Sequence, residues 1–132
     1  MSGPVWAAAE NPVLMKAQGS GFTPIEWTTT KSCEIYLDRV EQKQSYGKDN
    51  VTVTRTFPVS IDSSIQLLIA AAEKENFDSV PTLCDAPFTS IYALNSKGDE
   101  VALSAFSYCS QDGERNGPAS THLKQIVQLL CD

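Results

Sequence analysis

Apolar and polar residues alternate along two stretches in the first half of the chain. Cys33, Ile35 and Leu37 fall on one face of the first stretch, as expected for a half-buried strand. One face of the second stretch is likewise apolar, with threonines opposite. A Gly-Lys-Asp turn separates the stretches, so the pattern predicts two strands. The apolar residues of the second stretch are Val51, Val53, Phe57, Val59 and Ile61.

The period then becomes helical. From Ile65 to Ala72 the apolar residues recur at i, i+3, i+4 and i+7, and Asp62 or Ser63 is a suitable N-cap. The second half repeats this order. Two alternating runs within 88–109 flank Ser96-Lys97-Gly98-Asp99, which predicts a hairpin in which Asn95 faces Glu100. A second amphipathic helix is expected to begin at Pro118.

Strand–strand–helix occurring twice predicts an α+β fold. We expect an antiparallel sheet of about five strands with both helices on one face. Further strand signals lie in "PVLMKAQ" and "IEWTTT" near the start. Residues 11–132 are expected to form a single domain. Residues 1–10 read as a signal-peptide remnant, or as residues foreign to the natural chain, because Val5-Trp6-Ala7 and Ala7-Ala8-Ala9 have the spacing that signal peptidases cut.

Four cysteines lie far apart, with no two within twenty residues of each other. This spacing offers no short metal-ligand pair, and an even number in a small chain favours two disulfides. The hairpin register places Cys109 opposite Ala86, close to Cys84, which predicts a Cys84–Cys109 bond. Cys33 and Cys131 then join the first strand region to the C-terminal helix. Free thiols and a zinc site remain alternatives.

The chain has a net charge of −6 and no run of lysine or arginine. This argues against nucleic acid and anionic membranes as partners, because phosphate binding needs clustered cations. No apolar run is long enough to span a membrane. An acidic protein is better suited to a basic partner, although simple solubility explains the charge equally well.

Candidate catalytic chemistry is sparse. The single histidine, His122, has no nucleophile or carboxylate motif beside it. The pairs Glu34 with Asp38 and Asp112 with Glu114 resemble solvated strand and loop charges. "GSGF" at 19–22 lacks the lysine of a phosphate-binding loop. We therefore expect a protein that is not an enzyme and that needs no cofactor or metal.

Polar and aromatic residues gather after the second hairpin, in the composition that protein interfaces favour. We expect them to form a protruding loop that binds a partner, and deletion of 111–116 to leave the fold intact while abolishing binding. An ordinary solvated loop and a homodimer contact remain alternatives. The candidate residues are Tyr108, Gln111, Asp112, Glu114, Arg115 and Asn116, joined by Lys97 of the hairpin turn.

The start "AAAENPVLMKA", the four cysteines and the strand–strand–helix plan together resemble periplasmic immunity proteins. These proteins protect bacteria from their own type VI secretion effectors, here the lysozyme-like toxins that degrade peptidoglycan. A second stretch, "YALNSKGDEVALS", resembles the lysine-glycine-acidic hairpin of bacterial C-type lysozyme inhibitors. Both resemblances imply a periplasmic protein that occludes the substrate cleft of a cognate peptidoglycan hydrolase.

The implied mechanism is steric and electrostatic. Arg115 or Lys97 would donate to the catalytic carboxylates of the hydrolase, while Asp112 and Glu114 would pair with cations at the cleft rim. Two alternatives stay open. An exported ligand-binding or structural domain should contain an apolar cavity between helices and sheet, and a small secreted hydrolase should contain a pocket of converging titratable groups.

Overall fold

The structure is a computed structural model that describes residues 11–19, 29–46, 52–80, 88–106 and 112–131. These residues form one eight-stranded sheet in which every pair of neighbours is antiparallel. The order of strands across the sheet is β4-β3-β2-β1-β6-β7-β8-β5. The strands are β1 Leu14–Gly19, β2 Thr29–Ile35, β3 Arg39–Tyr46, β4 Thr52–Pro58, β5 Phe77–Val80, β6 Phe88–Leu94, β7 Glu100–Phe106 and β8 Asp112–Arg115.

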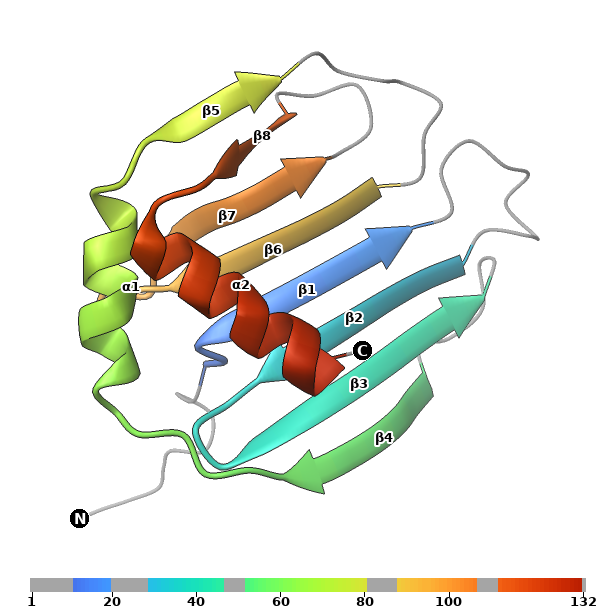
Figure 1. The fold of residues 1–132 in the computed structure, drawn as a ribbon. Coiled ribbons are helices and arrows are strands. Elements are labelled where there is room, and N and C mark those ends of the chain that lie inside the picture. The colour runs from blue at the N-terminus through green and yellow to red at the C-terminus, as the bar shows by residue number, and fades with distance from the viewer. Residues whose placement is uncertain (1–10, 20–28, 47–51, 81–87, 107–111, 132) are drawn as a thin grey trace.

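Two helices lie on one face of this sheet (Figure 1). Helix α1, Ile65–Glu73, lies along one end of the strands, on the path from edge strand β4 to the opposite edge strand β5. Helix α2, Pro118–Cys131, crosses the same face from the end of β8 toward β2 and β3. The expected class and the placement of both helices are confirmed. Neither helix described here is long and apolar enough to cross a membrane.

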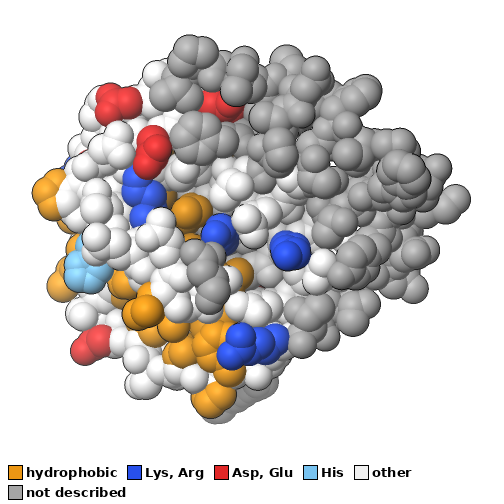
Figure 2. Space-filling model, turned by 45° about the vertical axis from the view of Figure 1, so that its right-hand side comes forward, with side chains coloured by type: hydrophobic (Ala, Val, Ile, Leu, Met, Phe, Trp, Pro, Cys, Tyr) orange, Lys and Arg blue, Asp and Glu red, His pale blue; other side chains and the backbone are white. Residues whose placement is uncertain are grey.

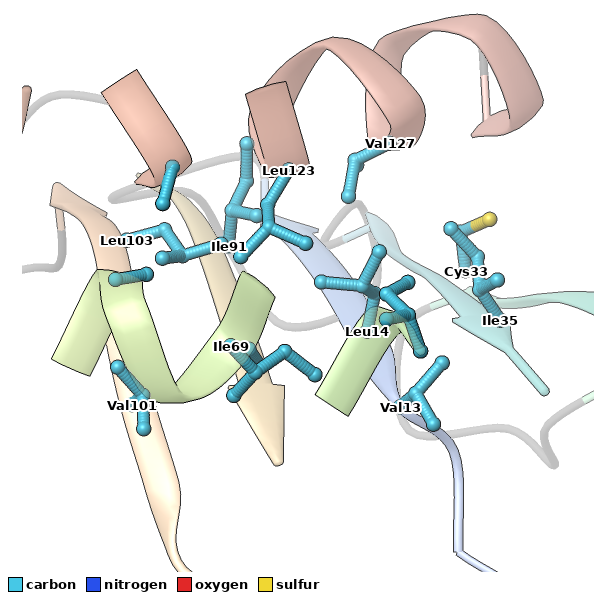
Figure 3. Packing of buried hydrophobic residues seen from close by; sticks show 14 of the residues in the cluster. Val13, Leu14, Cys33, Ile35, Ile69, Ile91, Val101, Leu103, Leu123 and Val127 are labelled. Atoms are coloured by element: carbon cyan, nitrogen blue, oxygen red, sulfur yellow. The ribbon is translucent and has the colours of Figure 1, made fainter. Parts of the chain in front are cut away.

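The hydrophobic core fills the space between the helices and the sheet (Figure 3). Ile69 of α1 and both Leu123 and Val127 of α2 point toward Leu14 and Ile91 of the central strands. All but Ile91 of these five are completely buried. Burial of each large aliphatic side chain contributes about 1.5–3 kcal/mol, so this contact between layers is the main stabilising feature.

The centre of the sheet joins the two halves of the chain. Strand β1 pairs with β2 on one side and with β6 on the other, with Leu14 opposite Ala93. Strands β1 to β4 are consecutive neighbours, as are β6 to β8, whereas β5 pairs with β8 at the far edge. Each helix therefore follows four strands in the chain, so the expected two strand–strand–helix units are wrong.

The expected count of about five strands is also wrong. The long first stretch divides into β2 and β3 at a tight turn, where the Tyr36 N–H donates to the Arg39 carbonyl at 2.8 Å. No glycine or proline marks this turn, so the alternation runs through it unbroken. Strands β5 and β8 have only four residues each, and β8 has the polar sequence Asp-Gly-Glu-Arg, which is typical of a loop. The hairpin register differs too, since Leu94 rather than Asn95 faces Glu100.

A single disulfide, rather than the expected two, is present in the described part of the chain. It joins Cys33 of β2 to Cys131 at the end of α2, with 5.9 Å between the Cα atoms. This pairing confirms the one that elimination predicted. Cys84 and Cys109 lie outside the described residues. A disulfide is compatible with an oxidising, exported compartment.

Candidate functional site

The segment that was expected to protrude as a binding loop forms part of the sheet instead. Residues 112–115 are strand β8, which pairs with β7 on one side and β5 on the other. Asp112 is 5% exposed. A Cβ atom added at Gly113 would collide with the Phe77 ring of β5, so this position requires glycine. Deletion of 111–116 would therefore remove a strand, contrary to the expectation from the sequence.

Two polar side chains of this segment contact Lys124 of α2. The Glu114 carboxylate forms an ion pair with the Lys124 ammonium group of α2 at 2.9 Å. The Asn116 side chain accepts a hydrogen bond from the same ammonium group at 3.4 Å. Tyr108 and Gln111 lie outside the described residues. The segment thus connects the sheet to α2, and the Glu114 carboxylate takes part in that connection.

Arg115 donates hydrogen bonds to carbonyl groups at the C-terminal end of α1. Its guanidinium donates to the carbonyl oxygens of Glu75 at 2.6 Å, Glu73 at 3.3 Å and Ala72 at 3.4 Å. It also donates to the Ala102 carbonyl of β7 at 2.8 Å. The last carbonyls of a helix have no partner within the helix, so a fixed cation there satisfies them and stabilises the helix dipole. These contacts give Arg115 a structural role.

Glu75 accepts hydrogen bonds from N–H groups at the start of α2. Its carboxylate accepts hydrogen bonds from the Ser120 hydroxyl at 2.6 Å, the Ser120 N–H at 2.9 Å and the Ala119 N–H at 3.0 Å. The Ser120 hydroxyl, together with these N–H groups and the charge of Arg115, holds the pKa of Glu75 below its ordinary value, while burial acts in the opposite direction. Sequence reasoning missed this residue, since its partners lie more than forty residues away.

A third charged cluster occupies the face of β2 and β3 away from the helices. Lys43 forms ion pairs with Glu34 at 2.9 Å and Glu41 at 3.9 Å, and Arg39 pairs with Glu41 at 2.7 Å. The hydrogen bond to Glu34 raises the pKa of Lys43. Burial, followed by the negative charge of Glu34, raises the pKa of Tyr36. Opposite charges therefore neutralise each other across this surface.

Lys97, in the turn between β6 and β7, is exposed. The Asn95 side-chain oxygen accepts hydrogen bonds from the N–H groups of Lys97 and Asp99, both at 2.9 Å. The Asn95 amide reaches the Glu73 carboxylate of α1 at 3.3 Å. Gly98 adopts a left-handed φ of +85°, as this turn requires. The backbone of the turn is thus fixed by local hydrogen bonds and tied to α1.

The tip of this turn stands clear of the rest of the described molecule. A Cβ atom added at Gly98 would meet nothing within 4 Å. All residues from 96 to 100 are exposed. Lys97 therefore lies on an exposed turn whose backbone is fixed by the hydrogen bonds of Asn95. Of the candidate residues that the structure describes, Lys97 is the one whose placement best suits contact with a partner.

Chemical sites of other kinds find little support among the described residues. No group of three His, Cys, Asp or Glu side chains in these ranges is arranged to hold a metal ion. His122 is exposed and borders a shallow apolar hollow of about 490 Å³ between α1 and α2, beside Leu67, which is 76% exposed.

No protein-family model, curated protein or solved structure matches this chain. The fold itself defines the class, an α+β protein with one eight-stranded antiparallel sheet and two helices on one face. Any functional assignment therefore depends on the surface residues described above.

Proposed function

We propose that this protein inhibits a cell-wall hydrolase toxin and acts as an immunity protein in the periplasm. The β6–β7 turn, Asn95 to Glu100, enters the substrate cleft, and Lys97 pairs with the catalytic carboxylates. The observation that carries this proposal is an exposed turn whose backbone is fixed by hydrogen bonds and which carries an exposed lysine. Glycoside hydrolases keep a pair of carboxyl groups in the cleft, and a lysine is a suitable partner for them.

The rigidity of the turn favours binding because little conformational entropy is lost on docking. Asn95 holds the backbone before any partner arrives, and its contact with Glu73 keeps the turn aligned with α1. Asp99 and Glu100 lie exposed beside Lys97. These carboxylates complement a cationic cleft rim. One short turn therefore offers an ammonium group for the carboxylates inside the cleft and carboxylates for a basic rim.

The overall charge supports the same partner. A net charge of −6 attracts a basic protein at long range, and the exposed lysine then acts at short range. The Cys33–Cys131 disulfide suits an oxidising compartment such as the periplasm. The resemblance of "YALNSKGDEVALS" to lysozyme-inhibitor hairpins falls on this turn.

The test uses the secreted and periplasmic peptidoglycan hydrolases of the source organism, separated by ion exchange and assayed by dye release from labelled peptidoglycan. We expect the protein to inhibit at least one glycosidase fraction. Lys97→Ala should raise the inhibition constant about 10- to 100-fold, because a charged hydrogen bond contributes about 1.5–3 kcal/mol.

Lys74→Ala is the matched control, since Lys74 is also an exposed lysine and lies at the C-cap of α1. It should inhibit as strongly as the unmodified protein. The proposal fails if every hydrolase fraction stays active, or if Lys97→Ala inhibits as well as Lys74→Ala.

A further inference from the structure

Three neighbouring strands change from apolar to polar residues at the same level of the sheet. On the face that carries the helices, each of the three strands has a completely buried aliphatic residue at the same end of the sheet. Further along, the side chains of the same face become amides and ammonium groups. The sequence of residues on that face is Leu14, Lys16 and Gln18 in β1, Ile35, Cys33 and Lys31 in β2, and Val40, Gln42 and Gln44 in β3.

The strand register arranges these polar residues in two rows. Lys16, Cys33 and Gln42 are direct cross-strand partners, as are Gln18, Lys31 and Gln44. Direct partners have Cβ atoms about 4.5–5.5 Å apart and diagonal neighbours are about 7–8 Å apart, so the two lysines are close enough to act on one ligand. They border a hollow of about 370 Å³.

The hollow exists because α2 ends above it. Cys131, the last residue of the helix, is bonded to Cys33 in the first polar row, and both half-cystines line the hollow. Beyond this bond the strands continue without a helix over them (Figure 1). The disulfide holds the end of α2 at a fixed position above β2, so the shape of the hollow is largely set before a ligand arrives.

The described lining of the hollow differs in charge from the chain as a whole. Acidic residues outnumber basic ones by 16 to 10 in the chain, yet the described residues that line the hollow include no aspartate or glutamate. Figure 2 shows hydrophobic side chains toward the left and lower part of this face, and Lys and Arg side chains across its centre. Simple solubility of an uncovered sheet face would be expected to use the more abundant acidic residues as well.

We propose that this hollow binds a small hydrophilic anion that carries a carboxylate or phosphate group together with hydroxyl or amide groups. Lys31 supplies an ammonium donor for the anionic group, Lys16 adds positive charge beside it, and the side chains of Gln18 and Gln44 donate to and accept from its neutral polar groups. The volume lies at the small end of the range for ligand sites. This site is separate from the β6–β7 turn, and the inference does not depend on the proposed inhibitory function.

The test compares acidic ligands with neutral ligands of similar shape. N-acetylmuramic acid is paired with N-acetylglucosamine, and glucose 6-phosphate with glucose. Binding is measured by calorimetry and by amide chemical shifts of the isotopically labelled protein. We expect one acid of the two pairs to bind at submillimolar concentration, to shift signals of β1, β2 and β3, and to bind at least tenfold more tightly than its neutral partner. The acid that binds identifies the carboxylate or the phosphate as the group recognised.

Lys31→Gln should weaken binding of that acid about tenfold, whereas Lys74→Gln, a change at an exposed lysine of α1, should have no effect. The inference is overturned if neither acid binds, if acid and neutral sugars bind equally, or if Lys74→Gln weakens binding as much as Lys31→Gln. Because no hydrolase takes part, failure here leaves the proposed inhibitory function standing, and the reverse also holds.

Discussion

The two ends of the helix-covered face of the sheet are built in opposite ways. At the end where α1 and α2 meet, polar side chains are fully engaged, with Arg115 on the carbonyls of α1 and Glu75 on the N–H groups of α2. At the other end the Cys33–Cys131 bond adds a covalent link to the apolar packing of α2, and polar side chains border a hollow. Polar residues on the same face thus stabilise the fold at one end, while at the other they line the hollow that we propose as a ligand site.

The largest effect on stability is expected at the covalent end. Replacement of both Cys33 and Cys131 by alanine should lower the free energy of unfolding by about 4 kcal/mol, because the bond closes a loop with a sequence separation of 98. Urea unfolding of the variant and of the unmodified protein, both without reductant, measures the difference. A loss of less than about 1 kcal/mol would show that α2 is held by its apolar contacts alone.

The noncovalent end should respond nearly as strongly to the loss of Arg115. Arg115→Ala leaves the carbonyls of Ala102 and Glu75 without their donor, and we expect a loss of about 3 kcal/mol in the same urea experiment. Arg115→Lys keeps the charge but not the planar group that reaches several carbonyls at once, so it should restore only part of this loss. Full stability of Arg115→Ala would contradict the structural role.

The same end should also weaken at low pH. The pKa of Glu75 is lowered in the folded protein, so its stabilising contribution is fully present above the ordinary glutamate value of 4.5 and is lost as the pH falls through the lowered folded value. Glu75→Gln should therefore have a lower Tm than the unmodified protein at neutral pH, and the difference should shrink in acid. Thermal unfolding followed from pH 7 downward checks this. A difference that stays constant below pH 4.5 would exclude Glu75 as its source.

The smallest effects are expected at the exposed cations. Lys97→Ala and Lys31→Ala should each change the free energy of unfolding by less than about 0.5 kcal/mol, since both side chains are exposed. Such a result, beside the large effect of Arg115→Ala, would sharpen the distinction between cations that stabilise the fold and cations available to a partner or ligand. A loss above about 1 kcal/mol at either lysine would remove that distinction.

Local patterns in the sequence were sufficient for the class of fold. Alternation and helical periodicity identified the hairpin, both helices and their common face, and elimination gave the Cys33–Cys131 pair. Short strands were beyond the same reasoning, because four residues are too few for a period to stand out. Strand β8 has the sequence Asp-Gly-Glu-Arg, which is typical of a loop. Its strand conformation comes from the neighbours that pair with it on both sides.

The candidate site was only partly predictable for a related reason. Lys97 and Arg115 both belong to polar, glycine-containing segments, and the sequence gives no sign of which one is exposed. Arg115 contacts residues about forty positions away, so its role depends on tertiary structure. The polar rows of the hollow did have a local signal, since Lys16 and Gln18 continue the alternation of Leu14. That these residues line a hollow could not be predicted, because it depends on the register by which β1, β2 and β3 change from apolar to polar residues at the same level.

The pairing of β1 with β6 has a consequence for how the molecule forms. Residues near position 14 join residues near position 93 in the middle of the sheet, whereas the hairpins on either side connect residues close together in sequence. Closing so large a loop costs chain entropy, which slows the pairing of β1 with β6. We therefore expect the two groups of hairpins to form early and the β1–β6 pair at the centre of the sheet to form late. Until then, the strand edges that become the centre of the sheet are open to pairing with other chains.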